Sequence, residues 1–328
     1  MSDVARSRPE LEKEQRLTLI QHEASALVPR DPSFAIASAE RGYYELPLLK
    51  EPTWTCEIPL YFFVGGAAGT AAVIAGIAEL TGASPKLVRD ARRISIAGAI
   101  LSPGLLISDL GRPERFLAML RVFKPQSPMS VGVWILMGFS AGTTAANAGA
   151  WMRERSMFSA LAALLQRLGD VGALLFGLPF ASYTGVLIGA TVIPAWNCNA
   201  SLLPGHFLAS GLGASVGMLE LAGNNESALQ WLGLGAAVAE TAVGAKIELQ
   251  DNPAEQPLKR GPSGWLIRLG GVLSGPVPLA LRAVSFFVKP KRAAKLRKYA
   301  AVSAVVGSAI TRAAWIHAGH VSAQESRP

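Results

Sequence analysis

Two carboxyl groups lie at the ends of long apolar stretches, and this position favours proton-transfer chemistry. Glu57 opens the apolar run of residues 58–78, and Asp109 closes a second apolar stretch over about residues 91–110. An ionisable side chain at the centre of a bilayer costs about 2.5 to 3.5 kcal/mol and is kept there mainly for function or pairing. A carboxylate in a site of low dielectric constant can act as a general base, so we expect Asp109 and Glu57 to take part in proton transfer.

A short motif follows Asp109. Residues 107–129 read ISDLGRPERFLAMLRVFKPQSPM, which predicts a Gly-Arg-Pro turn and then a short amphipathic helix in the membrane interface. One face of that helix carries Phe116, Met119, Leu120 and Phe123. Arg112 and Arg115 are placed to neutralise Asp109 or to bind the head group of a ligand.

The second half of the chain carries four further ionisable side chains inside apolar segments: Glu240, Lys246, Arg268 and Arg312. Two interpretations are open for them. They are either neutralised within a helix bundle or part of a proton path.

Cysteines and histidines are too few for a metal-containing redox cofactor. An iron–sulfur cluster usually needs four thiolates, and the chain has only Cys56 and Cys198. These two could form a disulfide or be unrelated small side chains. A haem needs two histidines at similar depth, for which His206 with His317 is the conceivable pair, although histidines at span ends more often donate hydrogen bonds. We therefore expect no haem, no iron–sulfur cluster and no metal site, so electrons must pass through another subunit or a diffusible carrier.

The elements that position these residues are predicted to be membrane-spanning helices. Of the residues, 50% are hydrophobic and only 16% are charged, against about 25% charged in soluble domains. A spanning helix needs about 20 mostly apolar residues. Uncharged runs at 58–78, 125–152 and 171–219 supply four spans, and weaker segments at 91–110, 230–249, 264–287 and 297–316 supply four more. The sequence thus predicts an all-α integral membrane protein with eight transmembrane helices.

Charge and the terminal segments predict the topology. Residues 1–56 form an extramembrane tail, and the stretch 43–54 (YYELPLLKEPTW) is either an interfacial anchor or a surface that a partner covers. Residues 317–328 form a short C-terminal tail. In the loops and flanking segments of the predicted spans, 13 lysines and arginines lie on one side and 9 on the other. Because positive residues favour the cytoplasmic side, this bias predicts that both termini lie outside. The net charge of +8 is clustered in loops bordering the membrane, so we expect lipid contact and no nucleic-acid binding.

Several motifs resemble the NrfD/PsrC family, the membrane subunits of polysulfide-reductase-like and related iron–sulfur molybdoenzyme complexes. They are PLYFFVGGAAG at 59–69, DLGRP at 109–113 with Arg115 and Phe116, SPMS at 127–130, YTG at 183–185, LP at 203–204 with SG at 210–211, and Arg312 ahead of AG at 318–319. They occur in the expected order over residues 43–321.

The resemblance implies two four-helix bundles, residues 57–193 and 194–316, in the inner membrane of a bacterium. It implies a site for menaquinone or ubiquinone in the first bundle, beside a docked iron–sulfur subunit that works with a molybdopterin catalytic subunit. The family site corresponds here to Glu57, Tyr61, Asp109 and Tyr183, with Arg112 beside Asp109. Some members have Asn and His at the start of the first span, whereas this chain reads TCEIPLYFF. Glu57 is therefore the proposed substitute for proton transfer.

Two other functions stay open. A transporter or proton channel would use the ionisable groups of the second half and helices interrupted at Pro179, Pro204 and Pro276. A purely structural membrane anchor would need neither Asp109 nor Tyr183.

Overall fold

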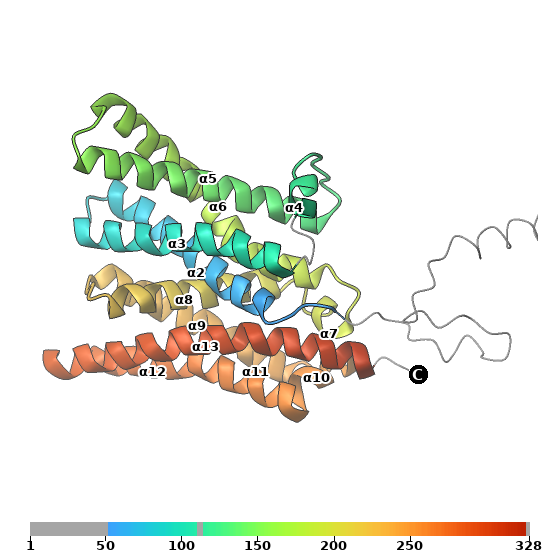
Figure 1. Ribbon diagram of the computed structural model, residues 1–328. Coiled ribbons are helices and arrows are strands. Elements are labelled where there is room, and N and C mark those ends of the chain that lie inside the picture. Colours follow the sequence, from blue (N-terminus) through green and yellow to red (C-terminus); the bar gives the residue numbers. More distant parts are fainter. Residues whose placement is uncertain (1–51, 110–113, 326–328) are drawn as a thin grey trace, which may run out of the picture. The chain divides into compact units, whose positions relative to one another are not determined.

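The computed structural model describes residues 52–109 and 114–325, and every regular element within them is a helix (Figure 1). The long helices of the first half are α2 (Glu57–Leu80), α3 (Pro85–Asp109), α5 (Pro128–Glu154) and α6 (Ser159–Gly189). Those of the second half are α8 (Leu203–Leu221), α9 (Ser227–Leu249), α11 (Gly261–Ser274), α12 (Pro276–Ser285) and α13 (Pro290–Glu325). Short elements join them: α4 (Glu114–Met119), α7 (Pro194–Asn197), η2 (Pro253–Glu255) and α10 (Gln256–Lys259).

Five helical segments of the described residues are long and apolar enough to cross a membrane. They are Glu57–Leu80, Pro128–Glu154, Ser159–Gly189, Gly261–Ser285 and Pro290–Gln324. The remaining long helices, α3, α8 and α9, are long enough but are not apolar enough to be among them. The described residues are thus all-helical, as expected, and the five segments fit the expected membrane protein, while the arrangement of eight spans in two bundles stays a prediction.

Helix α2 is the central element of the first half. It packs against α3, α6, α8 and α13, and it is the most buried of the five candidate spans. Small residues allow this close packing, as in other helix bundles in lipid. A Cβ atom on Gly69 would lie 2.5 Å from the carbonyl oxygen of Gly177 in α6, and one on Gly211 in α8 would lie 2.8 Å from that of Gly66. The sequence GGAAG therefore sets how closely α2 approaches its neighbours.

The long helices lie side by side in the order that Figure 1 shows, from α5 and α6, through α2 and α3, then α8 and α9, to α11, α12 and α13. We call α2, α3, α5 and α6 the first helix group, and α8, α9, α11, α12 and α13 the second. The groups meet where α2 contacts α8 and α13, and where α6 contacts α8.

Aromatic residues close one end of the molecule, where α4 and α7 lie (Figure 1). Trp196 of α7 is fully buried and donates from Nε1 to the carbonyl of Trp315 at 2.7 Å. Trp54 stacks on Trp196 with ring centroids 5.3 Å apart and meets Phe62 edge-on. Trp54 is thus part of the folded core, whereas residues 43–51 of the expected docking segment lie outside the described residues.

The helix bounds differ from the expected spans in three places. Helix α6 begins at Ser159, twelve residues before the uncharged run, because Asp170 is paired with Arg92 of α3. The expected span 264–287 is divided into α11 and α12 at Gly275, ahead of Pro276. Helix α13 continues to Glu325, through the residues expected as a C-terminal tail.

Candidate functional site

Asp109 joins the end of α3 to the segment that leads into α2. The backbone N–H of Thr55 donates to Oδ1 of Asp109 at 3.3 Å, and the Thr55 hydroxyl donates to the same oxygen at 2.9 Å. Glu57 follows two residues later, in the first turn of α2. The two predicted carboxyl groups therefore belong to one local structure, and Thr55 is a member of it that the sequence analysis missed.

Tyr61 lies one helical turn beyond Glu57 and is 6% exposed. Its ring contacts Phe62 at 5.6 Å and Phe180 of α6 at 6.3 Å between centroids. Phe180 in turn stacks on Phe139 of α5 at 4.5 Å. The phenol of Tyr61 thus lies one turn from the partly exposed Glu57, in a cluster of aromatic rings from α2, α5 and α6.

Tyr183 is held by α5. Its hydroxyl donates to the carbonyl of Pro128 at 2.8 Å, and its ring packs over the backbone of Gly132. The hydroxyl proton is therefore engaged, while the oxygen can still accept a hydrogen bond. Tyr183 and Asp109 have separate sets of partners, and Arg112 lies outside the described residues.

A cavity of about 300 Å³ lies beside the start of α5. It is lined mainly by α4, by the turn that follows it and by α5, among them Met119, Val122, Met129 and Ser130. All of these except Ser130 fall within residues 107–129, the motif expected to lie in the membrane interface. Pro128, which accepts the Tyr183 hydrogen bond, falls between the lining residues Ser127 and Met129. The cavity consequently adjoins the first turn of α5, where Tyr183 is anchored.

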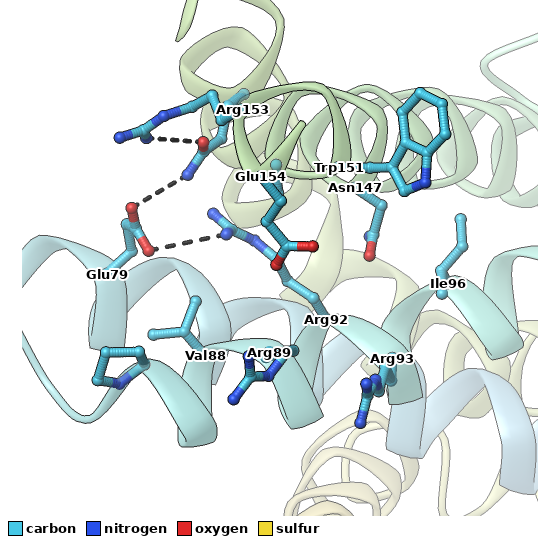
Figure 2. Close-up of a pocket in the computed structure, with 13 residues that line it drawn as sticks. Glu79, Val88, Arg89, Arg92, Arg93, Ile96, Asn147, Trp151, Arg153 and Glu154 are labelled. Carbon is cyan, nitrogen blue, oxygen red and sulfur yellow. Dashed lines mark hydrogen bonds and ion pairs between the residues drawn. The ribbon is translucent and has the colours of Figure 1, made fainter. Parts of the chain in front are cut away.

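The opposite end of the first helix group carries a network of charges around a larger cavity of about 670 Å³ (Figure 2). Arg92 binds both carboxylate oxygens of Asp170, at 2.7 and 2.9 Å, and lies 3.7 Å from Glu79. Gln166 connects Glu79 to Arg153 through hydrogen bonds of 3.0 and 2.8 Å. Because each charge in this network faces an opposite charge or an amide, its evident role is to neutralise ions between helices.

The ionisable residues expected in the second half mostly find partners within it. Nδ1 of His206 lies 3.0 Å from Oε1 of Glu240, whose other oxygen accepts from Ser274 at 2.7 Å. Arg268 pairs with Glu248, and Lys246 is exposed.

Arg312 is fully buried and binds protein oxygens instead of a carboxylate. It donates to the carbonyls of Phe62 and Phe207 and to the hydroxyl of Ser210, at 3.3, 2.7 and 2.6 Å. A second buried pair, which sequence reasoning missed, joins Glu220 to Arg282.

The donors for a metal are sparse in the part of the chain that the structure describes. It holds no group of three or more His, Cys, Asp or Glu placed to bind a metal ion. Cys56 and Cys198 are both free thiols. His206 faces Glu240, and His317 is exposed.

Comparison with known families gives one match. The family model described as polysulphide reductase, NrfD, matches residues 49–224, more than half of the 328 residues. This range contains Glu57, Tyr61, Asp109 and Tyr183, and it confirms the resemblance found in the motifs. No curated protein matches the chain.

Proposed function

The chain belongs to the polysulphide reductase NrfD family of membrane subunits of redox complexes, and on that premise we propose that it is the quinone-reactive subunit of such a complex. It binds quinone or quinol in the membrane and exchanges electrons with a docked iron–sulfur subunit, which serves a molybdopterin catalytic subunit. The quinone is menaquinone or ubiquinone.

The observation that carries this proposal is the contact between Asp109 and Thr55. It brings an acid from the end of α3 next to the start of α2, where Glu57 and Tyr61 follow within two turns. These carboxyl groups are partly exposed and the phenol is buried, so a proton acceptor and a hydrogen-bond donor stand together at one end of the first helix group.

The end of the first helix group that carries Asp109 and Glu57 also defines the proposed arrangement in the membrane. We propose that the long helical segments, with α11 and α12 as one interrupted span, form eight spans in two four-helix bundles of a bacterial inner membrane. Asp109 and Glu57 then lie at the outer face, on the side of both termini. The partner subunit docks at this end, beside α4, α7 and the segment before Trp54.

The residues divide the chemistry between them. Oxidation of a quinol releases two electrons and two protons, and a general base must accept each proton. Asp109 and Glu57 accept them at the membrane boundary. Tyr61 donates a hydrogen bond to a ring oxygen. The Tyr183 oxygen accepts one from a quinol hydroxyl, while its own hydroxyl proton remains donated to the carbonyl of Pro128. The same groups serve in reverse when the complex reduces quinone.

The cavity beside α4 is a suitable place for the ring. Its volume of about 300 Å³ is at the lower end of ligand pockets; Met119, Val122 and Met129 form its apolar part, and Lys124, Ser127 and Ser130 its polar part. Its position next to the interfacial motif gives a lipid-soluble ring access from the membrane.

The test is quinol-linked electron transfer by the intact complex. Replacing Asp109→Asn removes a base and should lower the rate by about 10²- to 10⁴-fold. Glu114→Gln is the matched control, because Glu114 is an exposed carboxyl group at the start of α4. Electron transfer from an artificial donor to the iron–sulfur partner should be unchanged in both variants. Full quinol activity in Asp109→Asn and in Tyr183→Phe would identify the chain as a structural anchor.

One observation favours a second candidate. The break between α11 and α12 at Gly275 and Pro276 is the kind of interrupted helix that transporters use at a binding site. Uptake of solute or protons by liposomes that contain the subunit alone would support transport. Tight liposomes would argue against transport.

A further inference from the structure

A cavity of about 390 Å³ lies within the second helix group, among α8, α9, α11, α12 and α13. Its floor is polar and buried, since His206, Glu240 and Thr311 are 4%, 2% and 2% exposed. Its rim is open, since the lining residues Ala245 and Val272 are exposed, and the rim also carries the exposed ion pair of Arg268 and Glu248. An accessible cavity with apolar walls and a few convergent polar groups is the usual form of a site for a small molecule.

The polar groups on the floor have unused hydrogen-bonding capacity. Nδ1 of His206 and Oε1 of Glu240 are 3.0 Å apart, yet neither makes an aligned hydrogen bond within the described residues. The hydroxyl of Thr311 also lacks a partner there. Ser274 occupies only the other oxygen of Glu240. Because unpartnered buried polar groups are costly, an oxygen-bearing ligand that reaches this floor would be favoured.

The opening lies near the middle of a candidate membrane span. Val272 and Pro276 line the cavity within the segment Gly261–Ser285. Pro276 has no N–H, so the carbonyl of Val272 lacks its usual donor four residues on. Irregular backbone at this depth is tolerated where it lines a cavity. A ligand therefore enters from the hydrocarbon layer and must be soluble in lipid.

We propose that this cavity binds a second molecule of the quinone class, separate from the one proposed near Asp109. A quinone has a flat apolar ring and oxygens on opposite edges. One ring oxygen accepts from His206 or the Thr311 hydroxyl in the quinone form and donates to Oε1 of Glu240 in the quinol form, and the ring lies between the walls formed by Gly244 and Gly271. The choice of ligand rests on the proposed function, which brings the chain into contact with quinones of the membrane.

Glycines supply a matched pair of variants. A Cβ atom at Gly244 or at Gly235 meets nothing within 4 Å, and both residues belong to α9, but only Gly244 lines the cavity. Gly244→Leu therefore fills the cavity, whereas Gly235→Leu adds the same volume outside it. Thr311→Val keeps the shape of the floor and removes one hydroxyl.

The experiment is photolabelling of the intact complex in membranes with an azido-substituted benzoquinone that carries a short isoprenoid tail. Labelled peptides are mapped by mass spectrometry. The expected result is labelling within residues 241–248 or 267–276, retained in Gly235→Leu and lost in Gly244→Leu. Thr311→Val should require a probe concentration about ten-fold higher for half-labelling. Unlabelled quinone should compete, and a fatty acid of similar length should not.

Three results would overturn this inference: label confined to the first helix group, label in Gly244→Leu equal to that in Gly235→Leu, or competition by the fatty acid alone. Labelling should persist in Asp109→Asn, which separates the two sites. If quinol activity is normal and these peptides stay unlabelled, the second site fails while the proposed function stands. If the peptides are labelled and the wild-type complex has no quinol activity, the binding site stands and the proposed function fails.

Discussion

The buried pair of Glu220 and Arg282 should be one of the interactions on which the second helix group depends. Glu220 of α8 and Arg282 of α12 are 6% and 1% exposed, and two parallel hydrogen bonds of 2.8 and 2.7 Å join them. The bidentate geometry satisfies both carboxylate oxygens. Such a pair compensates each charge for the loss of water, but only while both partners are present.

Removing one partner leaves the other charge buried without compensation. Glu220→Gln should therefore lower the free energy of unfolding by about 3 to 5 kcal/mol. At about 1.4 kcal/mol per factor of ten, the folded-to-unfolded ratio falls between a hundred-fold and a few thousand-fold. The double variant Glu220→Leu with Arg282→Met removes both charges, so it should be close to the wild type in stability or exceed it.

The backbone of α9 provides a second perturbation of the same pair. A Cβ atom at Gly233 would lie 2.4 Å from Cζ of Arg282, whereas one at Gly235 would meet nothing within 4 Å. Gly233→Ala should displace the guanidinium and destabilise by about 1 to 3 kcal/mol, and Gly235→Ala should be nearly neutral.

The assay is the half-life of the purified protein in mild detergent at a fixed elevated temperature, read as the fraction that still elutes as a single species in gel filtration. A rate is the appropriate measure because large membrane proteins rarely unfold reversibly. The expected order of half-lives is wild type and Gly235→Ala longest, then Gly233→Ala, then Glu220→Gln. A Glu220→Gln protein that lasts as long as the wild type, or a double variant weaker than either single one, would refute this reasoning.

Three further predictions concern other contacts. Gly69→Val should push α2 away from α6 and reduce the yield of folded protein by more than the conservative Gly69→Ala, measured by gel filtration. Burial, and then the carboxylate of Glu255, raise the pKa of the Cys198 thiol, so in a Cys56→Ser background the midpoint of its alkylation rate against pH should lie above that of an ordinary cysteine thiol; a midpoint below about 8.5 would contradict this. Trp54→Ala should shorten the thermal half-life by removing the stack on Trp196, whereas Trp54→Phe should largely preserve it.

The sequence predicted the helical membrane class and the family, because both depend on local composition and on motifs. The predicted span began after Asp170, whereas α6 begins at Ser159, because a search for uncharged residues does not show which charges are paired. Arg92 neutralises Asp170 from a helix 78 residues earlier in the chain. The pairing is a property of packing, so only the structure could reveal it.

The sequence indicated some residues of the candidate site but not their contacts. Asp109 and Glu57 were found because an acid at the end of an apolar run is conspicuous. Thr55 was not, because a threonine in a polar segment carries no signal until the end of α3 is placed beside it. His206 was considered at a span end as an interfacial group, and the structure places it deep enough to face Glu240.

The two helix groups differ in how they accommodate polar groups, and this difference supports separate roles for them. In the first group, Arg92 forms ion pairs with Asp170 and Glu79 at one end, while Asp109 at the other end binds only Thr55 among the described residues and is partly exposed. In the second group, Glu220 is fully paired, whereas Glu240 retains one oxygen without an aligned donor beside an open cavity. Fully satisfied pairs hold helices together and have no capacity left for a ligand. Asp109 and Glu240 retain capacity beside an accessible end or cavity, so they are positions at which chemistry or binding should be sought, and replacing each with its amide would separate those roles from the structural ones.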